Sequence, residues 1–258
     1  MLRKRIVPAI DVLNDKAVKY VQFRNPTIIG DPAELGKKYS EDGADELIYL
    51  DTTASLKNQE LKLEWIQKVA EQVYIPFSVI GGVRTLDDFK RLLRAGADKV
   101  GVNSAAVLRP ELLREAADIY GKQCVVLGLD AMPIYNEEEE IIRWEVYTHS
   151  GHEKTGMDVV EWAQQATDLG AGEIICTSIH KDGMKNGYDI ELIKLLSEKV
   201  NVPIIASGGA GKIEHIEEVF TEGHADAALV ASMIHYGDYT ISEIKAYLQE
   251  KHINVRMQ

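Results

Sequence analysis

Two aspartates, Asp11 and Asp130, each close an apolar run of the sequence, as do Asp51 and the pair Thr177-Ser178. Two carboxylates can share acid and base work when their surroundings push their pKa values apart, so that one gives a proton while the other takes one. The alternative for any single aspartate after a strand is that it caps the helix that follows. The sequence therefore offers Asp11 and Asp130 as a candidate acid–base pair.

Two Gly-Gly pairs, Gly81-Gly82 and Gly208-Gly209, each follow a predicted strand and precede a predicted helix. Glycine lets backbone N–H groups approach a ligand closely, and a helix N-terminus favours a phosphate. Asn103-Ser104 and Ala231-Ser232 stand one strand further on, and Asp182-Gly183 can line the second of the two sites. This pattern predicts two matched phosphate sites for an elongated small molecule with a phosphate at each end. Two independent packing motifs are the alternative.

These motifs belong to an internal repeat. Residues 81–104 match residues 208–232 at an offset of 127, with one extra residue near His224. Gly43–Leu47 recurs as Gly170–Ile174 at the same offset. A repeat of half the chain is too long for a solenoid unit, so it indicates a fold with pseudo-twofold internal symmetry.

Short aliphatic runs alternate with longer amphipathic segments such as Leu86–Ala95 and Ile213–Glu222. Apolar strands separated by helices are typical of a parallel sheet covered on its outside. Eight such units, built from two equivalent halves, predict an α/β fold of the (β/α)8 TIM barrel type with internal half-barrel duplication, in one domain spanning residues 1–258. The predicted strands are Ile6–Val12, Glu46–Leu50, Phe77–Ile80, Lys99–Val102, Val125–Leu129, Glu173–Thr177, Pro203–Ala206 and Ala227–Val230.

In such a barrel the active site lies at the C-terminal ends of the strands, so the two aspartates would face each other across the mouth. Residues 14–30, a polar segment carrying Lys19, are predicted to form a loop that acts as a lid. In residues 131–151, the acidic run Glu137–Glu140 is predicted to be a solvated turn. Arg143–Tyr147 then alternates as a hairpin strand does.

Four charged residues, Arg5, Glu46, Lys99 and Glu173, stand at the starts of strands and so near the bottom of the predicted barrel. If they point inward, they form a ring of two acids and two bases. Buried charges are costly unless they are paired, so such a ring needs a reason. The ring is either a structural salt-bridge plug or a gate for a small polar molecule that moves along the barrel axis.

Composition excludes several other classes of protein. The net charge of −12, without a block of Lys and Arg, argues against a nucleic-acid partner. The basic N-terminus is followed by a short strand-like run, which argues against a signal peptide or a membrane anchor. Cys124 and Cys176 lie in apolar runs and are predicted to be buried, reduced strand residues of a cytosolic protein. The seven histidines, His149 and His152 among them, show no metal spacing. We expect neither a metal nor a cofactor.

Further short stretches carry a resemblance to a known family. They are Lys4–Pro8, Gly43–Leu47, Thr53–Ser55, Ala95–Val100, Gly170–Ile174, Asp182-Gly183, Gly187–Asp189 and Ile205–Gly211. With them the chain resembles, essentially end to end, the cyclase subunit (HisF) family of imidazole glycerol phosphate synthase from histidine biosynthesis. The sister isomerase of the same pathway shares the half-barrel repeat but lacks the Thr-Ala-Ser and Gly-Tyr-Asp stretches.

The resemblance implies a cofactor-free cytoplasmic lyase. It condenses ammonia with the bisphosphorylated ribulosyl-aminoimidazole carboxamide nucleotide (PRFAR) and releases imidazole glycerol phosphate and aminoimidazole carboxamide ribotide (AICAR). A HisH-like glutaminase subunit docks on the bottom face, forms a heterodimer with the cyclase and delivers ammonia through the barrel.

The resemblance also implies residue roles. Asp11 and Asp130 match the catalytic pair, and Arg5, Glu46, Lys99 and Glu173 match an ammonia gate. The residues implied to bind substrate and phosphate are Lys19, Gly82, Asn103, Ser104, Thr177, Asp182, Gly183, Ser207, Gly209, Ala210, Ala231 and Ser232.

Four positions depart from the family pattern. Tyr20 replaces a glycine after the loop lysine, Ile80 replaces the first of three glycines, His180 replaces an aspartate and Met184 replaces a threonine. We expect Tyr20 to stiffen the lid and Ile80 to crowd the first phosphate site. One alternative function is the ammonia-dependent amidotransferase subunit of another pathway, such as amidino-sugar formation. A regulatory barrel without catalysis is another, although the retained aspartates argue against it.

Overall fold

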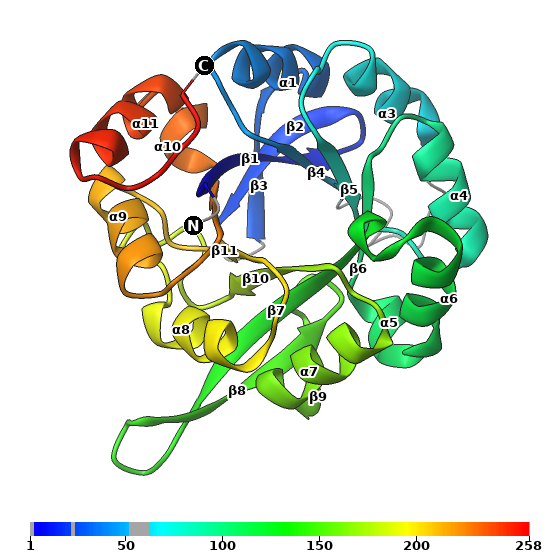
Figure 1. Cartoon of the computed structure of the whole chain (residues 1–258), viewed down its shortest axis with the longest axis vertical. Coiled ribbons are helices and arrows are strands. Elements are labelled where there is room, and N and C mark those ends of the chain that lie inside the picture. The colour runs from blue at the N-terminus through cyan, green and yellow to red at the C-terminus, as the bar shows by residue number, and fades with distance from the viewer. Residues whose placement is uncertain (1–2, 22–23, 52–61, 258) are drawn as a thin grey trace.

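The computed structural model of the chain describes residues 3–21, 24–51 and 62–257. Within these residues, eight parallel strands form a ring, seen end-on in Figure 1, with helices around its outside. The ring is closed because β10 pairs with both β7 and β11. The predicted (β/α)8 barrel is confirmed. In order, its strands are β1 (Arg5–Leu13), β4 (Leu47–Asp51), β5 (Phe77–Ile80), β6 (Lys99–Val102), β7 (Val125–Tyr135), β10 (Glu173–Ser178), β11 (Ile204–Ser207) and β12 (Ala227–Val230).

The strand bounds follow the apolar runs. β5, β6 and β12 have the predicted bounds, whereas Glu46 precedes β4 instead of starting it. β1 and β7 continue past Asp11 and Asp130, because each extends into an antiparallel hairpin above the barrel. Both aspartates therefore lie inside longer strands, at the height where the parallel barrel ends.

Several of the outer helices begin at residues that cap them. Thr85 and Asp88 form a capping box at α4, and Thr240 and Glu243 form one at α11. No helix in the described ranges is long and apolar enough to cross a bilayer. The longer helices are α1 (Pro32–Glu41), α3 (Leu63–Ala70), α4 (Leu86–Arg94), α6 (Glu111–Tyr120), α7 (Val159–Leu169), α8 (Ile190–Lys199), α9 (Ile213–Thr221) and α11 (Ile241–Glu250), and the short ones are α5 (Ser104–Leu108), η1 (Lys122–Cys124) and α10 (Ser232–His235).

The strands separate two apolar cores, because successive residues of a strand point to opposite faces. One core fills the space between strands and helices. The other lies inside the barrel and includes Val7, Ile48, Val126 and Ile205, each fully buried. The interior is thus packed with side chains between its two ends, as this fold requires.

The segment predicted as a lid loop is a β-hairpin. β2 (Lys16–Val21) pairs antiparallel with the end of β1, and β3 (Arg24–Gly30) pairs with β2. Asn14 and Asp15 form the turn between β1 and β2 with φ of 48° and 67°, which is the two-residue hairpin turn with both φ positive. The prediction of a loop was wrong because this turn lets the first strand double back on itself.

The second insertion forms the predicted hairpin. β7 pairs antiparallel with β8 (Ile141–Thr148), which pairs with β9 (Glu153–Asp158). Its tip projects from the barrel in Figure 1, and Glu137–Glu140 are exposed there. The solvated acidic turn is confirmed.

The prediction for the cysteines is half right. Cys176 is buried in β10, but Cys124 is partly exposed in the short helix η1, one residue before β7 begins. Its apolar neighbours belong to the strand, whereas Gly121 starts a separate turn at a positive φ of 89°.

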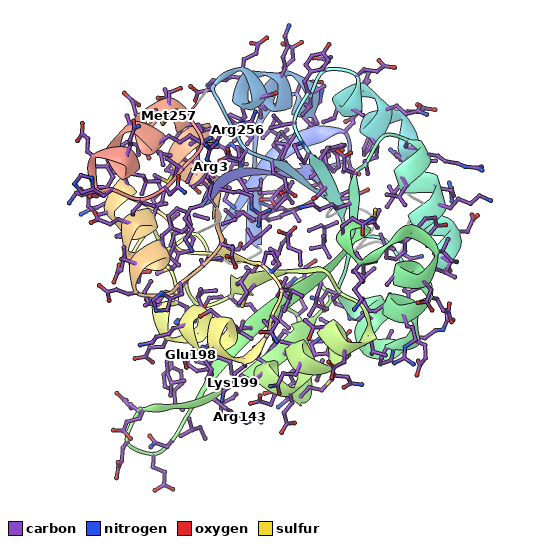
Figure 2. All side chains as sticks on the ribbon, viewed as in Figure 1. Arg3, Arg143, Glu198, Lys199, Arg256 and Met257 are labelled. Atoms are coloured by element: carbon purple, nitrogen blue, oxygen red, sulfur yellow. The ribbon has the colours of Figure 1, made fainter. Side chains whose placement is uncertain are left out.

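The two ends of the described chain lie side by side. The Lys4 N–H donates to the Asn254 carbonyl at 2.8 Å. Figure 2 shows Arg3 close to Arg256 and Met257 at the rim of the barrel. The C-terminal segment therefore fixes the start of β1.

The internal repeat is visible in backbone geometry. Gly81 and Gly208 have φ of 108° and 93°, and a Cβ on either would lie within 2.7 Å of the last carbonyl oxygen of the neighbouring strand, that of Asp51 in β4 or of Ser178 in β10. Asn103 and Ala231 share one conformation, with φ/ψ of −123°/−86° and −139°/−85°. His224, the extra residue of the second half, has a positive φ of 59°, as expected of an insertion in a turn.

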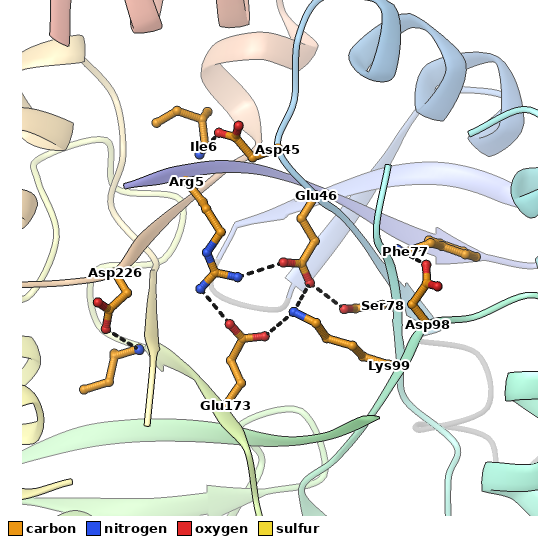
Figure 3. Close-up of polar contacts among 11 residues, drawn as sticks. Arg5, Ile6, Asp45, Glu46, Phe77, Ser78, Asp98, Lys99, Glu173 and Asp226 are labelled. Carbon is orange, nitrogen blue, oxygen red and sulfur yellow. Dashed lines mark hydrogen bonds and ion pairs between the residues drawn. The ribbon is translucent and has the colours of Figure 1, made fainter. Parts of the chain in front are cut away.

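A second pattern joins alternate strands at the bottom of the barrel. Asp45, Asp98 and Asp226 accept hydrogen bonds from the backbone N–H groups of Ile6, Phe77 and Ile204, at the starts of β1, β5 and β11, at 2.8, 2.8 and 3.0 Å. Each also donates its own N–H to the carbonyl of the same strand residue. Figure 3 shows these contacts around the barrel axis. They fix where the strands start.

Gly172 stands where the pattern would place a fourth aspartate. Its N–H still donates to Val125 at the start of β7, at 2.9 Å. A Cβ at Gly172 would lie 2.1 Å from the Lys122 carbonyl oxygen. The backbone of η1 therefore occupies the space that a side chain would need.

We predict that Gly172→Ala lowers the free energy of unfolding by roughly 1–3 kcal/mol, because the added methyl group meets backbone that cannot move aside cheaply. Urea denaturation measures the change. Gly128→Ala is the matched control, since its Cβ would have no neighbour nearer than 3.5 Å. Equal effects of the two substitutions would show that the contact with Lys122 imposes no constraint.

Candidate active site

A cavity of about 620 Å³ opens at the C-terminal ends of the barrel strands. The predicted catalytic, substrate and phosphate residues all line it, whereas the four predicted gate residues do not. Those lining residues are Asp11, Lys19, Gly82, Asn103, Ser104, Asp130, Thr177, Asp182, Gly183, Ser207, Gly209, Ala210, Ala231 and Ser232.

The order of the strands places the matched residues opposite one another. β1 and β7, which carry Asp11 and Asp130, are four strands apart in the closed ring of eight. The same holds for β5 and β11, which precede the two Gly-Gly turns, and for β6 and β12. The cavity therefore has a carboxyl group on each of two opposite walls and a glycine turn on each of the other two.

Asp11 is paired with the lysine of the first hairpin. The Lys19 Nζ lies 3.3 Å from Asp11 Oδ2, and both side chains are largely buried. Burial works against the charge of Lys19, but attraction to Asp11 and then to Asp182 outweighs it, so the pKa of Lys19 is raised. The hairpin thus brings a cation over the barrel mouth beside one catalytic candidate.

Asp130 has a different environment. Burial, followed by repulsion from Asp182, raises its pKa to about 7, against a smaller opposing effect of the Asn103 hydrogen bond. The Asn103 Nδ2 donates to Asp130 Oδ2 at 3.0 Å and to the Tyr147 carbonyl at 3.2 Å. Near neutral pH this carboxyl group exists in both protonation states, which suits a group that donates a proton.

The wall beside Asp130 carries two hydroxyl groups. Thr177 of β10 lies in register with Asp130 of β7, and Ser207 of β11 lies in register with Thr177. Parallel pairing therefore sets a carboxyl and two hydroxyls side by side along the rim of the cavity, where they can orient a polyhydroxylated molecule.

The first predicted phosphate site, at Gly82 and Ser104, includes residues that the sequence analysis missed. The Ser104 Oγ accepts a hydrogen bond from the His149 N–H at 3.0 Å. His149, Ser150 and Arg84 line the same cavity. His149 was considered solely as a metal ligand, since only the folded β8–β9 connection brings it to Ser104.

The second predicted phosphate site rests on the Gly187–Asp189 stretch. The Gly187 N–H donates to the Gly209 carbonyl at 2.9 Å, and the Tyr188 hydroxyl donates to the Leu229 carbonyl at 2.8 Å. Asp189 caps α8 and accepts a hydrogen bond from Trp144 Nε1 at 2.9 Å. These contacts fix the position of the turn at Gly209.

Two of the four departures from the family pattern, Tyr20 and Ile80, line this cavity. Tyr20 lines it and is buried, and Ile80 lines it from the barrel interior. The His180 ring Nδ1 lies 3.0 Å from Ser178 Oγ, whereas Met184 is half exposed. Thr53–Ser55, part of the resemblance, lies outside the described residues.

The four predicted gate residues form a closed ring of ion pairs at the bottom of the barrel (Figure 3). Arg5 lies 2.9 Å from Glu46 and 2.6 Å from Glu173, and Lys99 lies 2.8 and 2.7 Å from the same two carboxylates. Burial opposes the charge of Arg5, but attraction to Glu173 and Glu46 outweighs it and raises its pKa. Both carboxylates are buried, whereas both cations reach the bottom surface in part.

Within the described ranges, no three His, Cys, Asp or Glu side chains are grouped so that they could hold a metal ion. The described cavity offers two carboxyl groups that can each exchange a proton with a bound ligand, and hydroxyl groups and backbone N–H groups that can orient that ligand.

Comparison with known proteins shows which proteins this chain is similar to. A family model described as "Histidine biosynthesis protein" matches residues 5–240. The imidazole glycerol phosphate synthase subunit HisF of Geobacillus kaustophilus is 52% identical over 256 residues, which cover 99% of this chain and 100% of that protein. The HisF subunits of Geobacillus thermodenitrificans and Bacillus licheniformis are 51% and 50% identical with the same coverage.

We predict that Asp130→Asn raises the midpoint of thermal unfolding more at pH 8 than at pH 5. The folded-state pKa is about 7, well above that of an unfolded aspartate, so the wild type loses stability as the pH rises from about 4 to 7. An amide has no such penalty, and at pH 5 only part of the penalty has developed. Thermal melts at the two pH values measure the difference.

The control is Glu137→Gln in the exposed hairpin turn, which should shift the midpoint equally at both pH values. A pH-independent effect of Asp130→Asn would mean that burial does not perturb this carboxyl group.

Proposed function

The chain belongs to the histidine biosynthesis protein family, and from that premise we propose how its residues carry out the reaction of the cyclase subunit of imidazole glycerol phosphate synthase. In this reaction ammonia is condensed with PRFAR, and imidazole glycerol phosphate and AICAR are released. The observation that carries the assignment of roles is the single cavity with opposed carboxyl groups between two matched glycine turns.

The two glycine turns hold the two phosphates of PRFAR. Gly82, with Asn103 and Ser104, binds one phosphate through backbone N–H groups and the serine hydroxyl. The second site is formed by Asp182, Gly183, Gly209, Ala210, Ala231 and Ser232. Because the turns lie on opposite walls, a molecule held at both ends spans the mouth, and its middle lies between Asp11 and Asp130.

Asp130 acts as the acid and Asp11 as the base. Ammonia forms a bond to the ketose carbonyl carbon of the substrate, and the carbonyl oxygen must leave as water. Asp130, protonated in part near neutral pH, gives the proton that this oxygen needs. Asp11, ion-paired with Lys19, accepts a proton from the attacking nitrogen. Thr177 and Ser207 orient the substrate beside Asp130.

Ammonia enters from the bottom of the barrel through the ring of Arg5, Glu46, Lys99 and Glu173. The chain is one subunit of a complex, as its HisF relatives are named. We propose that the partner is a HisH-like glutaminase that docks on the face where the two cations reach the surface. Ammonia then passes from the glutaminase into the apolar interior without meeting solvent.

Two further proposals concern the chain as a whole. We propose that residues 1–258 form a single domain, since the barrel strands span the chain from Arg5 to Val230 and both ends meet at its rim. We also propose a cytoplasmic location, where the thiols of Cys124 and Cys176 stay reduced.

The direct test is incubation of the purified chain with PRFAR and an ammonium salt at alkaline pH, with detection of imidazole glycerol phosphate. We predict that Asp11→Asn and Asp130→Asn each lower kcat by roughly 10²–10⁴-fold, the range of general acid–base catalysis. PRFAR affinity, measured by calorimetry, should change little, because the phosphate contacts remain. A variant that keeps near-full rate would remove that aspartate from the mechanism.

We predict that Lys99→Ala uncouples glutamine hydrolysis from product formation in the complex with the glutaminase. The substitution removes two ion pairs and opens the ring, so ammonia escapes, whereas ammonium added to the solution still reaches the site from the mouth. The ratio of product to glutamate measures coupling, and Lys68→Ala on exposed α3 is the control. Equal loss with glutamine and with ammonium would refute the role of the ring as a gate.

A further inference from the structure

Three neighbouring strands differ from the rest of the barrel at the middle of its interior. Because alternate residues of a strand face inward, β6 presents Lys99, then Gly101, then Asn103 to the interior. In register with Gly101, β5 presents Ile80 and β7 presents Val126, whereas Gly128 lies one inward position further along β7, beside Asn103. Ile80 and Val126 therefore flank Gly101 between the ring of ion pairs and the Asn103–Asp130 pair.

Ile80 fills the space that the first glycine leaves. A Cβ at Gly101 would lie 2.5 Å from Ile80 Cγ1, 3.0 Å from Cδ1 and 3.1 Å from Cγ2. A Cβ at Gly128 would lie 3.8 Å from Ile80 Cγ2, which is ordinary contact. The isoleucine therefore lies directly on β6 and only touches the space over β7. The Ile80 side chain, which we expected to crowd the first phosphate site, therefore occupies the space left by the missing side chain of Gly101.

Ile80 faces both compartments of the barrel. It packs against the apolar interior cluster, and it also lines the cavity that contains Asp130. One inward position below it, Ser78 donates to Glu46 of the ring at 2.8 Å. A molecule that moves upward from Lys99 along β6 therefore passes over Gly101, between Ile80 of β5 and Val126 of β7.

We propose that Ile80 and Gly101 form a size-matched pair that makes Ile80 the constriction between the ring of ion pairs and the Asp130 cavity, and so sets the rate at which ammonia reaches the substrate. The inference rests on the proposed function, in which ammonia enters through the ring. An apolar constriction admits a small neutral molecule but disfavours the ammonium ion, which would lose its hydration there.

The pair also serves as a specificity element. The residue at position 80 decides the width of the passage, and Gly101 is the position that accommodates that residue. If Ile80 and Gly101 served only packing, substitutions that change side-chain size at these positions would alter stability. They would then change the glutamine-dependent and ammonium-dependent rates equally.

The test compares glutamine-dependent and ammonium-dependent rates in the complex with the glutaminase subunit. Gly101→Ala pushes the Ile80 side chain into the passage and is expected to lower the glutamine-dependent rate about tenfold or more, with the ammonium-dependent rate within about twofold. Ile80→Ala/Gly101→Ala removes the clash and should restore the glutamine-dependent rate, a coupling that a double-mutant cycle quantifies. Gly128→Ala, which adds the same methyl group at ordinary contact distances of 3.5 Å and more, is the matched control.

Equal loss with both nitrogen sources, or no recovery in the double variant, would overturn the constriction. If Gly101→Ala does not fold, as judged by circular dichroism, Ile80→Phe replaces it and is expected to cause the same selective loss; unchanged rates would overturn the proposal. A wild-type chain inactive with ammonium and PRFAR would instead refute the proposed function, so the two failures are distinguishable.

Discussion

Closure of the parallel sheet is the constraint on which the rest of this structure depends. Once β10 pairs with β7, residues four strands apart must face each other, and every second side chain must point into one narrow interior. A duplicated sequence that folds into such a barrel therefore forms a cavity with matched residues on opposite walls. The chemistry depends on small differences between the halves: Asp11 has Lys19 beside it, whereas Asp130 has Asn103.

The ring at the bottom shows how a barrel can hold four charges. Each carboxylate contacts both cations, and Glu46 receives a further hydrogen bond from Ser78. Satisfying the partners in this way offsets the desolvation that makes isolated buried charges costly. The contacts of Asp45 and Asp98 with the strand starts fix the backbone from which Glu46 and Lys99 project. The two cations and two carboxylates leave the closed ring neutral overall.

Much of this arrangement was predictable because its signals are local or repeated. Apolar runs define strands by their composition, and the matched Gly-Gly turns mark two equivalent loops. The contacts between residues far apart in the sequence could not be predicted. The space at Gly101 is defined by an isoleucine of another strand, and the absence of a side chain at Gly172 is enforced by the backbone of η1. The hairpin after β1 was missed because a two-residue Asn14-Asp15 turn resembles the start of a polar loop.

Along the barrel axis the lining changes from the charged ring to an apolar layer and then to the polar cavity. This order matters because ammonia is both a nucleophile and a base. Ammonia is reactive only while it is unprotonated. The ring of ion pairs has no net charge to attract or repel it, and the apolar layer above the ring has no proton to give.

The first acid that ammonia meets, under the proposed function, is Asp130. A carboxyl group of ordinary pKa that still carried a proton would surrender it to ammonia at once. With a pKa raised to about 7, Asp130 is a weaker acid than an ordinary aspartic acid, so the driving force for proton transfer to ammonia is smaller. Burial therefore keeps a protonated carboxyl group available near neutral pH for the substrate oxygen, and the apolar layer below it gives ammonia no proton on the way.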